Sequence, residues 1–291
     1  VWTNEDLKTF QGVYQGNHHV ISGALFCGSS AGLISSLEGA VVNLRMEHCA
    51  SIAKTLCQAI VVGESSGTVS NCSVSDSIVV SADTNAYTGA IVGLAKLNSV
   101  ISYNTSENNR IMNDGNAAGG IVGQSDVSVR DCLVNGGDVS GEESTGGIVG
   151  TVTNSAEGIC IHGCQSSANI SGKYHIGGIC GYYVQYTFIE PSGPLTISEC
   201  TNRGNLTERA VSDYGLKQYL GGIMGDAQGA VTITKCHNSG DVLSDQETCN
   251  ASEVNLGGIM GGIYNPEKWE CKISDTDNTC LLYTSPSPRD R

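Results

Sequence analysis

The segment Cys160-Ile-His-Gly-Cys164 has the residue types of a zinc site, because two thiols and an imidazole lie close together. Zinc needs ligands that converge on one point. In an extended strand the side chains alternate between faces, so Ile159 and Ile161 would point inward and Cys160 and His162 outward. Cys164 would follow a turn and point inward. The ligands would diverge, and we expect no metal site here.

The chain has 13 cysteines, and some of them recur three residues after an aliphatic side chain. These are Cys72, Cys132, Cys164, Cys200 and Cys236. Stacked coils would place their Cα atoms about 4.8 Å apart, but parallel side chains at that spacing do not suit a relaxed disulfide. We predict an interior ladder of thiols that fills a corner of the core. The off-ladder residues Cys249, Cys271 and Cys280 are better disulfide candidates in an oxidising compartment.

A second column carries side-chain oxygens directly before an aliphatic residue. Its members are Asp138, Asn169, Asn205 and Asp241. Rows of such oxygens can bind calcium, which makes Asp138 and Asp241 calcium candidates. Asn and Asp also favour left-handed turns and bond their own backbone, and two of the four are neutral amides. We favour the turn-forming role and expect no cofactor.

Aromatic residues gather in two long insertions, one between Gly181 and Cys200 and the other between Leu206 and Leu220. The residues are Tyr182, Tyr183, Tyr186, Phe188, Tyr214 and Tyr219. We expect the insertions to emerge on one side of the fold, where exposed tyrosines suit contacts with a sugar or a protein. The alternative is that these rings simply cover the core.

The sequence lacks the short motifs of common enzymes. A serine-triad spacing, a zinc-binding His-Glu-x-x-His and a phosphate-binding loop are absent. A polysaccharide lyase or hydrolase would need clustered carboxylates, or a base beside calcium-binding acids, on one exposed sheet. Charged residues make up only 15% of the chain and fall in the loops. We therefore predict no catalytic residues.

The elements that position these residues repeat along the chain. A unit Gly-Gly-Ile-Val-Gly, or a close variant, recurs about every 30 residues. Six clear copies end at Gly93, Gly123, Gly150, Gly181, Gly225 and Gly261. Each repeat holds three short apolar patches separated by Gly, Ser, Asn and Asp. The patches are short and rich in β-branched residues, which predicts strands and not helices.

Three short strands per repeat predict an all-β fold, a right-handed parallel β-helix (β-solenoid) of about eight coils. The paired glycines would permit a left-handed backbone at a corner and a close approach between coils. The three-residue step from aliphatic to cysteine predicts another corner, with the cysteine just past it. A β-propeller is the main competitor, but its blades need about 40 residues and usually carry aromatic signatures.

Composition narrows the classes of function. The chain of 291 residues is 40% hydrophobic, with 38 Gly but only 3 Phe and 2 Trp, so Ile, Val, Leu and Cys must fill the core. The formal net charge of −14 repels phosphate backbones and anionic membranes, which argues against nucleic acid as a partner. No apolar run approaches the ~18 residues of a membrane span, so we expect no membrane insertion.

Three runs resemble the opening of GLUG-type β-helical repeat proteins: 10–23 (FQGVYQGNHHVISG), 31–34 (AGLI) and 39–44 (GAVVNL). The Gly-Gly-Ile-Val-Gly units and runs such as 236–242 (CHNSGDV) look like the body of that family. The resemblance covers nearly the whole chain. It implies large secreted or cell-surface proteins of bacteria or protists, often adhesin-like and sometimes flanking a peptidase domain. It carries over no catalytic residue.

We expect residues 1–280 to form a single solenoid domain, with 1–20 as an entry or cap segment and 182–219 as long insertions. The chain begins without Met and in mid-pattern, which indicates a fragment. Residues 282–291 (LYTSPSPRDR) resemble a translated cDNA-library adaptor and break the repeat, so we interpret them as a non-native tail. Asn-x-Ser/Thr sequons, relevant in a eukaryotic secretory pathway, occur at Asn71, Asn104, Asn169, Asn205 and Asn250.

Three functions follow from these patterns. The first is a non-catalytic, adhesin-like module, secreted or on the cell surface, whose loops bind a glycan or a host or cell-surface protein. The second is a carbohydrate-active β-helix enzyme. The third is a structural spacer beside a catalytic domain outside this chain. We favour the first.

Overall fold

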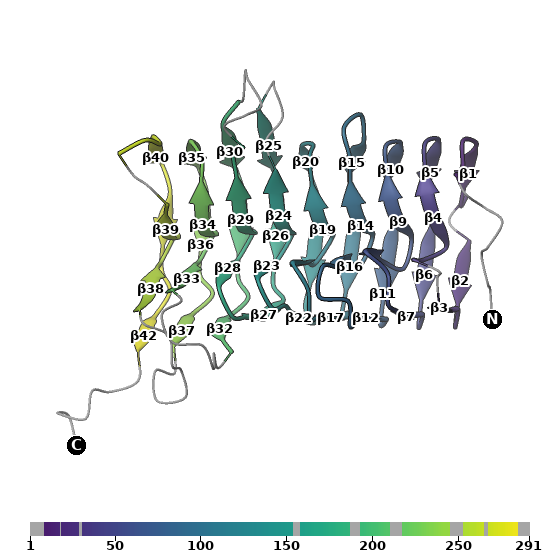
Figure 1. Ribbon diagram of the computed structural model, residues 1–291, viewed down its shortest axis with the longest axis horizontal. Helices are drawn as coiled ribbons and strands as arrows, with labels where there is room; N and C mark the ends of the chain where they lie inside the picture. The colour runs from purple at the N-terminus through teal and green to yellow at the C-terminus, as the bar shows by residue number, and fades with distance from the viewer. Residues whose placement is uncertain are drawn as a thin grey trace.

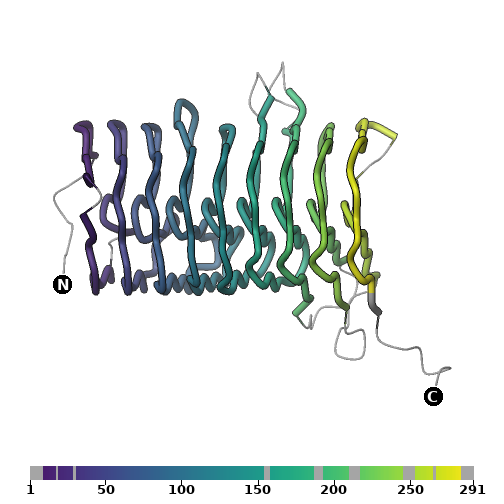
Figure 2. The backbone as a smooth tube through the Cα atoms, turned by 180° about the vertical axis from the view of Figure 1, so that it is seen from behind, coloured from purple at the N-terminus to yellow at the C-terminus, as the bar shows by residue number. Residues whose placement is uncertain are grey.

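The computed structural model describes residues 9–17, 19–28, 31–153, 158–186, 193–209, 217–244, 253–264 and 267–284. Within these ranges the chain forms strands only, and none of them contains a helix that could cross a membrane. Each strand pairs in parallel with its counterparts in the neighbouring coils. The coils follow one another along a single column in sequence order (Figures 1 and 2). The predicted parallel β-solenoid is confirmed.

The strands form five parallel sheets, which we number 1 to 5 in the order in which a coil passes through them. Sheet 1 consists of β1 (Val13–Gln15), β5 (Ala40–Val42), β10 (Thr68–Ser70), β15 (Val100–Ser102), β20 (Val129–Arg130), β25 (Ile159–His162), β30 (Leu195–Ser198), β35 (Val231–Thr234) and β40 (Cys271–Ser274). Sheet 2 consists of β2 (Val20–Ser22), β6 (Arg45–Glu47), β11 (Ser73–Ser75), β16 (Thr105–Glu107), β21 (Leu133–Asn135), β26 (Gln165–Ser166), β31 (Thr201–Asn202), β36 (His237–Asn238) and β41 (Asp277–Asn278).

The other three sheets complete the coil. Sheet 3 consists of β3 (Leu25–Gly28), β7 (Ala50–Ala53), β12 (Ile78–Ser81), β17 (Arg110–Asn113), β22 (Asp138–Ser140), β27 (Asn169–Gly172), β32 (Leu206–Glu208), β37 (Val242–Ser244) and β42 (Leu282–Thr284). Sheet 4 consists of β8 (Cys57–Gln58), β13 (Tyr87–Gly89), β18 (Ala117–Gly119), β23 (Ser144–Gly146), β28 (His175–Gly177), β33 (Lys217–Gly221) and β38 (Glu253–Gly257). Sheet 5 consists of β4 (Ile34–Leu37), β9 (Val62–Ser65), β14 (Val92–Ala95), β19 (Val122–Ser125), β24 (Val149–Thr153), β29 (Cys180–Val184), β34 (Met224–Gln228) and β39 (Met260–Ile263).

The described column has nine rungs in sheets 1 to 3, and a complete coil has five short strands in place of the three predicted. We number the coils 1 to 9 by their sheet 1 strand. The predicted number of strands per coil was too low because two of the three apolar patches bend in the middle and form two strands each. The aliphatic-x-x-Cys patch divides into sheets 1 and 2, and the Gly-Gly-Ile-Val-Gly patch divides into sheets 4 and 5.

The corner between sheets 1 and 2 lies where the sequence predicts it. A residue with positive φ occupies it in each of the nine coils: Asn17, Asn43, Asn71, Tyr103, Asp131, Gly163, Glu199, Lys235 and Asp275. The next residue then points into the core, as Cys72 does directly after Asn71. One left-handed residue therefore turns the chain without interrupting the apolar interior.

Sequence spacing predicts Tyr103 at the cysteine position after Val100, Cys49 as a looser member of the column after Met46, and Ile78 as the aliphatic residue six positions after Cys72. Strand pairing corrects all three. Val69 pairs with Ile101, so Asn104 and not Tyr103 occupies the cysteine position of coil 4. Cys49 aligns with Ser77, at the corner between sheets 2 and 3, and so is not part of the predicted cysteine column. In sheet 3 the buried residue is Val79, whereas Ile78 is 42% exposed. Each error arises because sequence spacing alone does not show on which side of a corner a residue lies.

The repeated glycines serve close packing and not a left-handed turn. The first two glycines of the repeat are absent from the residues with positive φ. A Cβ on Gly147 would lie 2.1 Å from the carbonyl oxygen of Gly178, in the next coil. The predicted close approach is therefore confirmed, and the predicted left-handed backbone at these glycines is wrong.

The positions of the strands also change the predicted bounds of the cap segment and of the tail, and the predicted placement of the two insertions. Residues 13–15 and 20–22 are strands of coil 1, so residues within 1–20 are part of the first coil. Leu282–Thr284 pairs with β37, so the start of the segment interpreted as a tail extends sheet 3. The two insertions lie in different connections, from sheet 5 to sheet 1 and from sheet 3 to sheet 4. The prediction that they emerge on one side is therefore wrong.

Candidate functional site

Glycine in sheet 5 lets that sheet pack directly against sheet 4 of the preceding coil. A Cβ on Gly225 would lie 2.6 Å from the backbone nitrogen of Ile176, so no larger residue fits there without a shift. This contact places the residue after the glycine, Asp226, beside the residue before the isoleucine, His175. Backbone contact between coils 6 and 7 thus brings together side chains that are far apart in sequence.

Three rings stack at this place. The ring of His175 lies 4.3 Å from that of Tyr182, at an interplanar angle of 17°, and 5.9 Å from that of Tyr219, at 4°. His175 is in register with Tyr219 in sheet 4, and Tyr182 is in register with Asp226 in sheet 5. We call His175, Tyr182, Tyr219 and Asp226 the aromatic cluster. Its members lie on strands, so their positions are fixed by the sheets.

The aromatic cluster contains a buried carboxylate. The side chain of Asp226 is 4% exposed, and its Oδ2 lies 3.4 Å from Nδ1 of His175. Its Oδ1 is buried and has no hydrogen-bond partner among the residues that the structure describes. The Tyr182 hydroxyl donates to Oε1 of Gln228 at 2.9 Å. Burial and then the Asp226 charge raise the pKa of the Tyr182 phenol, which keeps it a neutral donor.

The predicted aromatic residues divide into several environments. Tyr182 and Tyr219 are half-buried in the aromatic cluster, and Tyr186 is 40% exposed. Tyr183 is 1% exposed and its hydroxyl donates to the Gly193 carbonyl at 2.9 Å, so the expected exposure is wrong for this residue. Alternation along β29 accounts for it, because neighbouring residues of a strand point to opposite faces. Phe188 and Tyr214 lie outside the described residues.

Sequence reasoning missed His175 and Asp226. Each lies next to a repeat unit, two residues before Gly177 and directly after Gly225. These positions flank the Gly-Gly-Ile-x-Gly unit, where sheets 4 and 5 meet. The signal that could have identified them is a titratable residue at either flank of the repeat.

The predicted thiol ladder is formed and buried. Cys132, Cys164, Cys200 and Cys236 occupy one corner in consecutive coils, and they are free thiols. The thiols donate to backbone carbonyls, as from Cys200 to Ser198 at 3.3 Å and to Ile161 at 3.6 Å. Contact with the neighbouring thiol Cys164 and burial both raise the pKa of Cys132. Contact with the neighbouring ladder thiols lowers the pKa of Cys164 and of Cys236, so the shifts alternate along the ladder, which fills the core as a set of small, buried groups.

The other cysteines differ in their surroundings. Cys72 is buried as predicted, and burial raises the pKa of its thiol to about 11. Cys271 is an exposed free thiol whose sulfur lies 3.5 Å from that of Met260. Cys280 is also free and partly exposed. Cys249, the remaining disulfide candidate, lies outside the described residues.

The Cys160-x-His-x-Cys164 segment has the predicted alternation. Ile159 and Ile161 are buried, Cys160 and His162 are partly exposed, and Cys164 is buried after the corner. Across the described residues, no three His, Cys, Asp or Glu side chains are grouped as metal ligands.

Asp138, Asn169, Asn205 and Asp241 form one row across neighbouring coils. Asp138 and Asn169 begin strands of sheet 3, and Asn205 and Asp241 lie directly before strands of the same sheet. The members of this row bond one another and the next coil. Asn169 donates to Asp138 at 3.2 Å, Asn205 Oδ1 accepts from the Asp241 backbone at 3.0 Å, and Asp241 accepts from the Leu281 backbone at 3.0 Å. Asp138 and Asp241 are three coils apart, about 14 Å at the strand spacing, and so do not share one ion. None of the four has a positive φ, so the predicted left-handed turn is wrong for this row, and its side chains bond the backbone of the next coil in place of their own.

No known protein family, curated protein or solved structure matches this chain.

Proposed function

We propose that the chain is a non-catalytic repeat module, secreted or displayed on a cell surface, that binds a glycan through the aromatic cluster and the tyrosines beside it. The observation that carries this proposal is the stack of His175 with Tyr182 and Tyr219 on two adjacent coils. Its rings sit on paired strands, so a ligand meets them with little loss of side-chain freedom. Tyr186 and Tyr264, which are exposed, extend the aromatic surface.

The side chains of the aromatic cluster and its neighbours suit a sugar as ligand. Aromatic faces pack against the apolar C–H face of a sugar ring, and neighbouring polar groups can bond its hydroxyls. Gln228 and Tyr182 supply such polar groups at the cluster. The column acts as a rigid support, because its coils are joined by parallel pairing along its whole described length. Adhesin-like display and the GLUG-type family are part of the proposal and rest on the sequence resemblance alone.

A glycan-array screen of the full chain tests the proposal. We expect a bound glycan whose signal falls about tenfold or more in the double variant Tyr186→Ala, Tyr219→Ala, because each aromatic platform contributes on the order of 1 kcal/mol. Tyr103→Ala is the matched control, since Tyr103 is 61% exposed and lies in coil 4, at the corner between sheets 1 and 2.

The outcomes separate the alternatives. Absence of any bound glycan, or equal loss in the Tyr103→Ala control, contradicts the proposal and favours a spacer. Release of new reducing ends from a bound oligosaccharide would instead indicate a carbohydrate-active enzyme. Far-ultraviolet circular dichroism of each variant confirms that the coils remain folded.

A further inference from the structure

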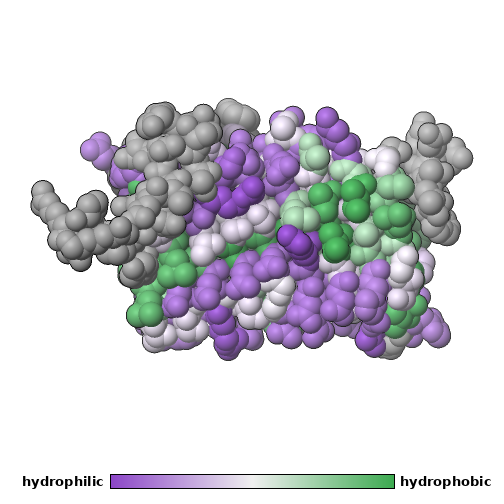
Figure 3. All heavy atoms as spheres, turned by 90° about the horizontal axis from the view of Figure 1, so that it is seen from below, coloured by the Kyte–Doolittle hydropathy of each residue, from purple (hydrophilic) through white to green (hydrophobic). Residues whose placement is uncertain are grey.

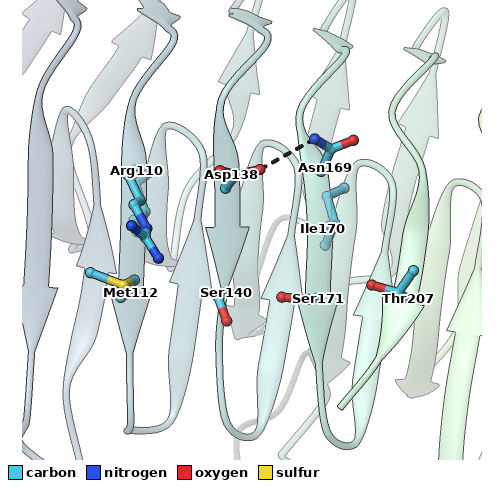
Figure 4. Close-up of a pocket in the computed structure, with 9 residues that line it drawn as sticks. Arg110, Met112, Asp138, Ser140, Asn169, Ile170, Ser171 and Thr207 are labelled. Atoms are coloured by element: carbon cyan, nitrogen blue, oxygen red, sulfur yellow. Dashed lines mark hydrogen bonds between the residues drawn. The ribbon is translucent and has the colours of Figure 1, made fainter.

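A shallow hollow lies on the outer face of sheet 3, across coils 4 to 7 (Figure 4). Its polar lining consists of Arg110, Asp138, Ser140, Asn169, Ser171 and Thr207. Strand pairing puts Met112, Ser140, Ser171 and Thr207 in one row, where two short side chains stand between longer ones. The two serines therefore form the floor, and the row containing Arg110, Asp138 and Asn169 forms one wall.

Two guanidinium groups lie at the hollow: Arg110 lines it, and Arg209 contacts Ser140 on its floor. Arg110 is in register with Asp138 and makes no ion pair with any described residue. Arg209 reaches back two coils, and its Nη1 donates to Oγ of Ser140 at 3.5 Å and to the carbonyl of Gly141 at 3.4 Å. Arg45 is the one described arginine with a carboxylate within 4 Å, so Arg110 and Arg209 share this lack of an ion pair with Arg130 and Arg203, whereas most described lysines lie within 4 Å of a carboxylate.

Other groups of the hollow suit a ligand rich in hydroxyls. The dashed line in Figure 4 marks the bond from Asn169 to Oδ1 of Asp138, which fixes both side chains along the wall. The hydroxyls of Ser140, Ser171 and Thr207 can each donate and accept. The spacing from one coil to the next is about 4.8 Å, so a linear chain lying along the column meets a new set of these groups at each coil.

The outer face of sheet 3 becomes apolar toward the N-terminus. Leu25, Ile52 and Ile78 of coils 1 to 3 are exposed on sheet 3. Viewed from below in Figure 3, apolar side chains gather over the N-terminal coils, and polar ones cover the middle of the column. A polar ligand therefore finds its partners over coils 4 to 7 and not beyond Arg110.

We infer that this hollow binds a carboxylate-bearing saccharide, a hexuronate segment, at a site separate from the aromatic cluster. Arg110 and Arg209 bind the carboxylate groups, since a guanidinium matches a carboxylate in shape and charge. Asp138, Asn169 and the serine floor bind the sugar hydroxyls. The inference does not depend on the proposed role of the tyrosines, because the two sites lie on different sheets and use different chemistry.

Isothermal titration of the full chain with a trigalacturonate tests the site, with cellotriose as the neutral comparison. We expect the acidic trisaccharide to bind and the neutral one to bind at least tenfold more weakly. Arg110→Gln should weaken binding of the acidic trisaccharide about tenfold or more. Arg110→Lys should recover only part of the loss, because an ammonium cannot form the paired bonds of a guanidinium.

Arg130→Gln is the matched control, since it removes the same charge from an exposed position on sheet 1. Equal weakening by Arg110→Gln and Arg130→Gln would show a general charge effect and overturn the site. Absence of trigalacturonate binding also overturns it, as does binding of a sulfated trisaccharide in its place. Tyr219→Ala should leave trigalacturonate binding unchanged. The titration therefore tests the hollow alone, and the glycan array tests the aromatic cluster.

Discussion

The carboxylate of Asp226 lies 3.4 Å from Nδ1 of His175, although the two residues belong to different sheets and consecutive coils. Only the bare backbone of Gly225 lets sheet 5 approach sheet 4 closely enough for this contact. The carboxylate is almost fully buried and its Oδ1 has no hydrogen-bond partner among the described residues, so the contact with the imidazole is what offsets the loss of water.

Replacing His175 with leucine should therefore destabilise the column. The variant removes the imidazole whose Nδ1 lies 3.4 Å from Oδ2 of Asp226, a pair that is ionic when His175 is protonated, and leaves a buried carboxylate. We expect a loss of about 2–4 kcal/mol in the free energy of unfolding by urea. His237→Leu is the control, because His237 pairs with the exposed Asp277 at 2.8 Å and such pairs contribute about 0–1 kcal/mol. Similar losses in both variants would contradict the buried-pair interpretation.

The buried thiol of Cys72 should make the protein less stable in alkaline solution. Burial raises the pKa of Cys72 from 9.0 to about 11, so the unfolded chain releases this proton at lower pH than the folded one. The contribution of the protonated Cys72 thiol to the free energy of unfolding is fully present below about pH 9 and is lost as the pH rises toward 11. For this thiol we expect a loss of about 1 kcal/mol between pH 9 and pH 10.

The measurement is the urea midpoint of the native chain and of Cys72→Ala at pH 8, 9 and 10. Other groups titrate in this range in both proteins, so the difference between the two slopes isolates Cys72. The variant should start less stable and depend less on pH. Parallel slopes would mean that Cys72 ionises in the folded state as easily as in the unfolded one.

The sequence predicts the column well because a solenoid is determined by local repetition. A short apolar patch that recurs at a nearly constant interval can bury its face only against its own copies. The corner before Cys72 follows from the same logic, since two inward residues three apart require a bend between them. These inferences need no knowledge of distant contacts.

Contacts between sheets were harder to predict. The pairing of His175 with Asp226 depends on which glycine lets two sheets touch, and the repeat pattern does not show that sheet 5 of one coil packs on sheet 4 of the preceding coil. Burial of Tyr183 depends on where β29 begins relative to the glycine. The hollow depends on Ser140 and Ser171 lying side by side in adjacent coils, which is visible only once the register is fixed.

Asn104 should be more important for stability than a cysteine in the same position. It replaces a thiol of the column in coil 4, and its side chain is buried. Its Oδ1 accepts from the Cys72 backbone at 3.0 Å and its Nδ2 donates to the Val69 carbonyl at 2.9 Å. Asn104→Ala leaves both backbone groups unpaired and should cost about 2–4 kcal/mol in urea unfolding. The exposed Asn135→Ala should cost less than about 0.5 kcal/mol, and equal effects would contradict this role.

Gly147 tests whether the repeat glycines act through packing or through chain flexibility. If flexibility alone mattered, Gly147→Ala would stabilise the protein by about 0.4–1 kcal/mol, because alanine restricts the unfolded chain. The structure predicts the opposite sign. A Cβ there would lie 2.1 Å from the Gly178 carbonyl oxygen and 2.4 Å from Oγ of Ser166, so adjacent coils must separate. We expect a loss of about 2 kcal/mol or more in urea unfolding. Gly12→Ala, whose Cβ meets only the Phe10 ring at 3.2 Å, should stay within about 0.5 kcal/mol of the native chain.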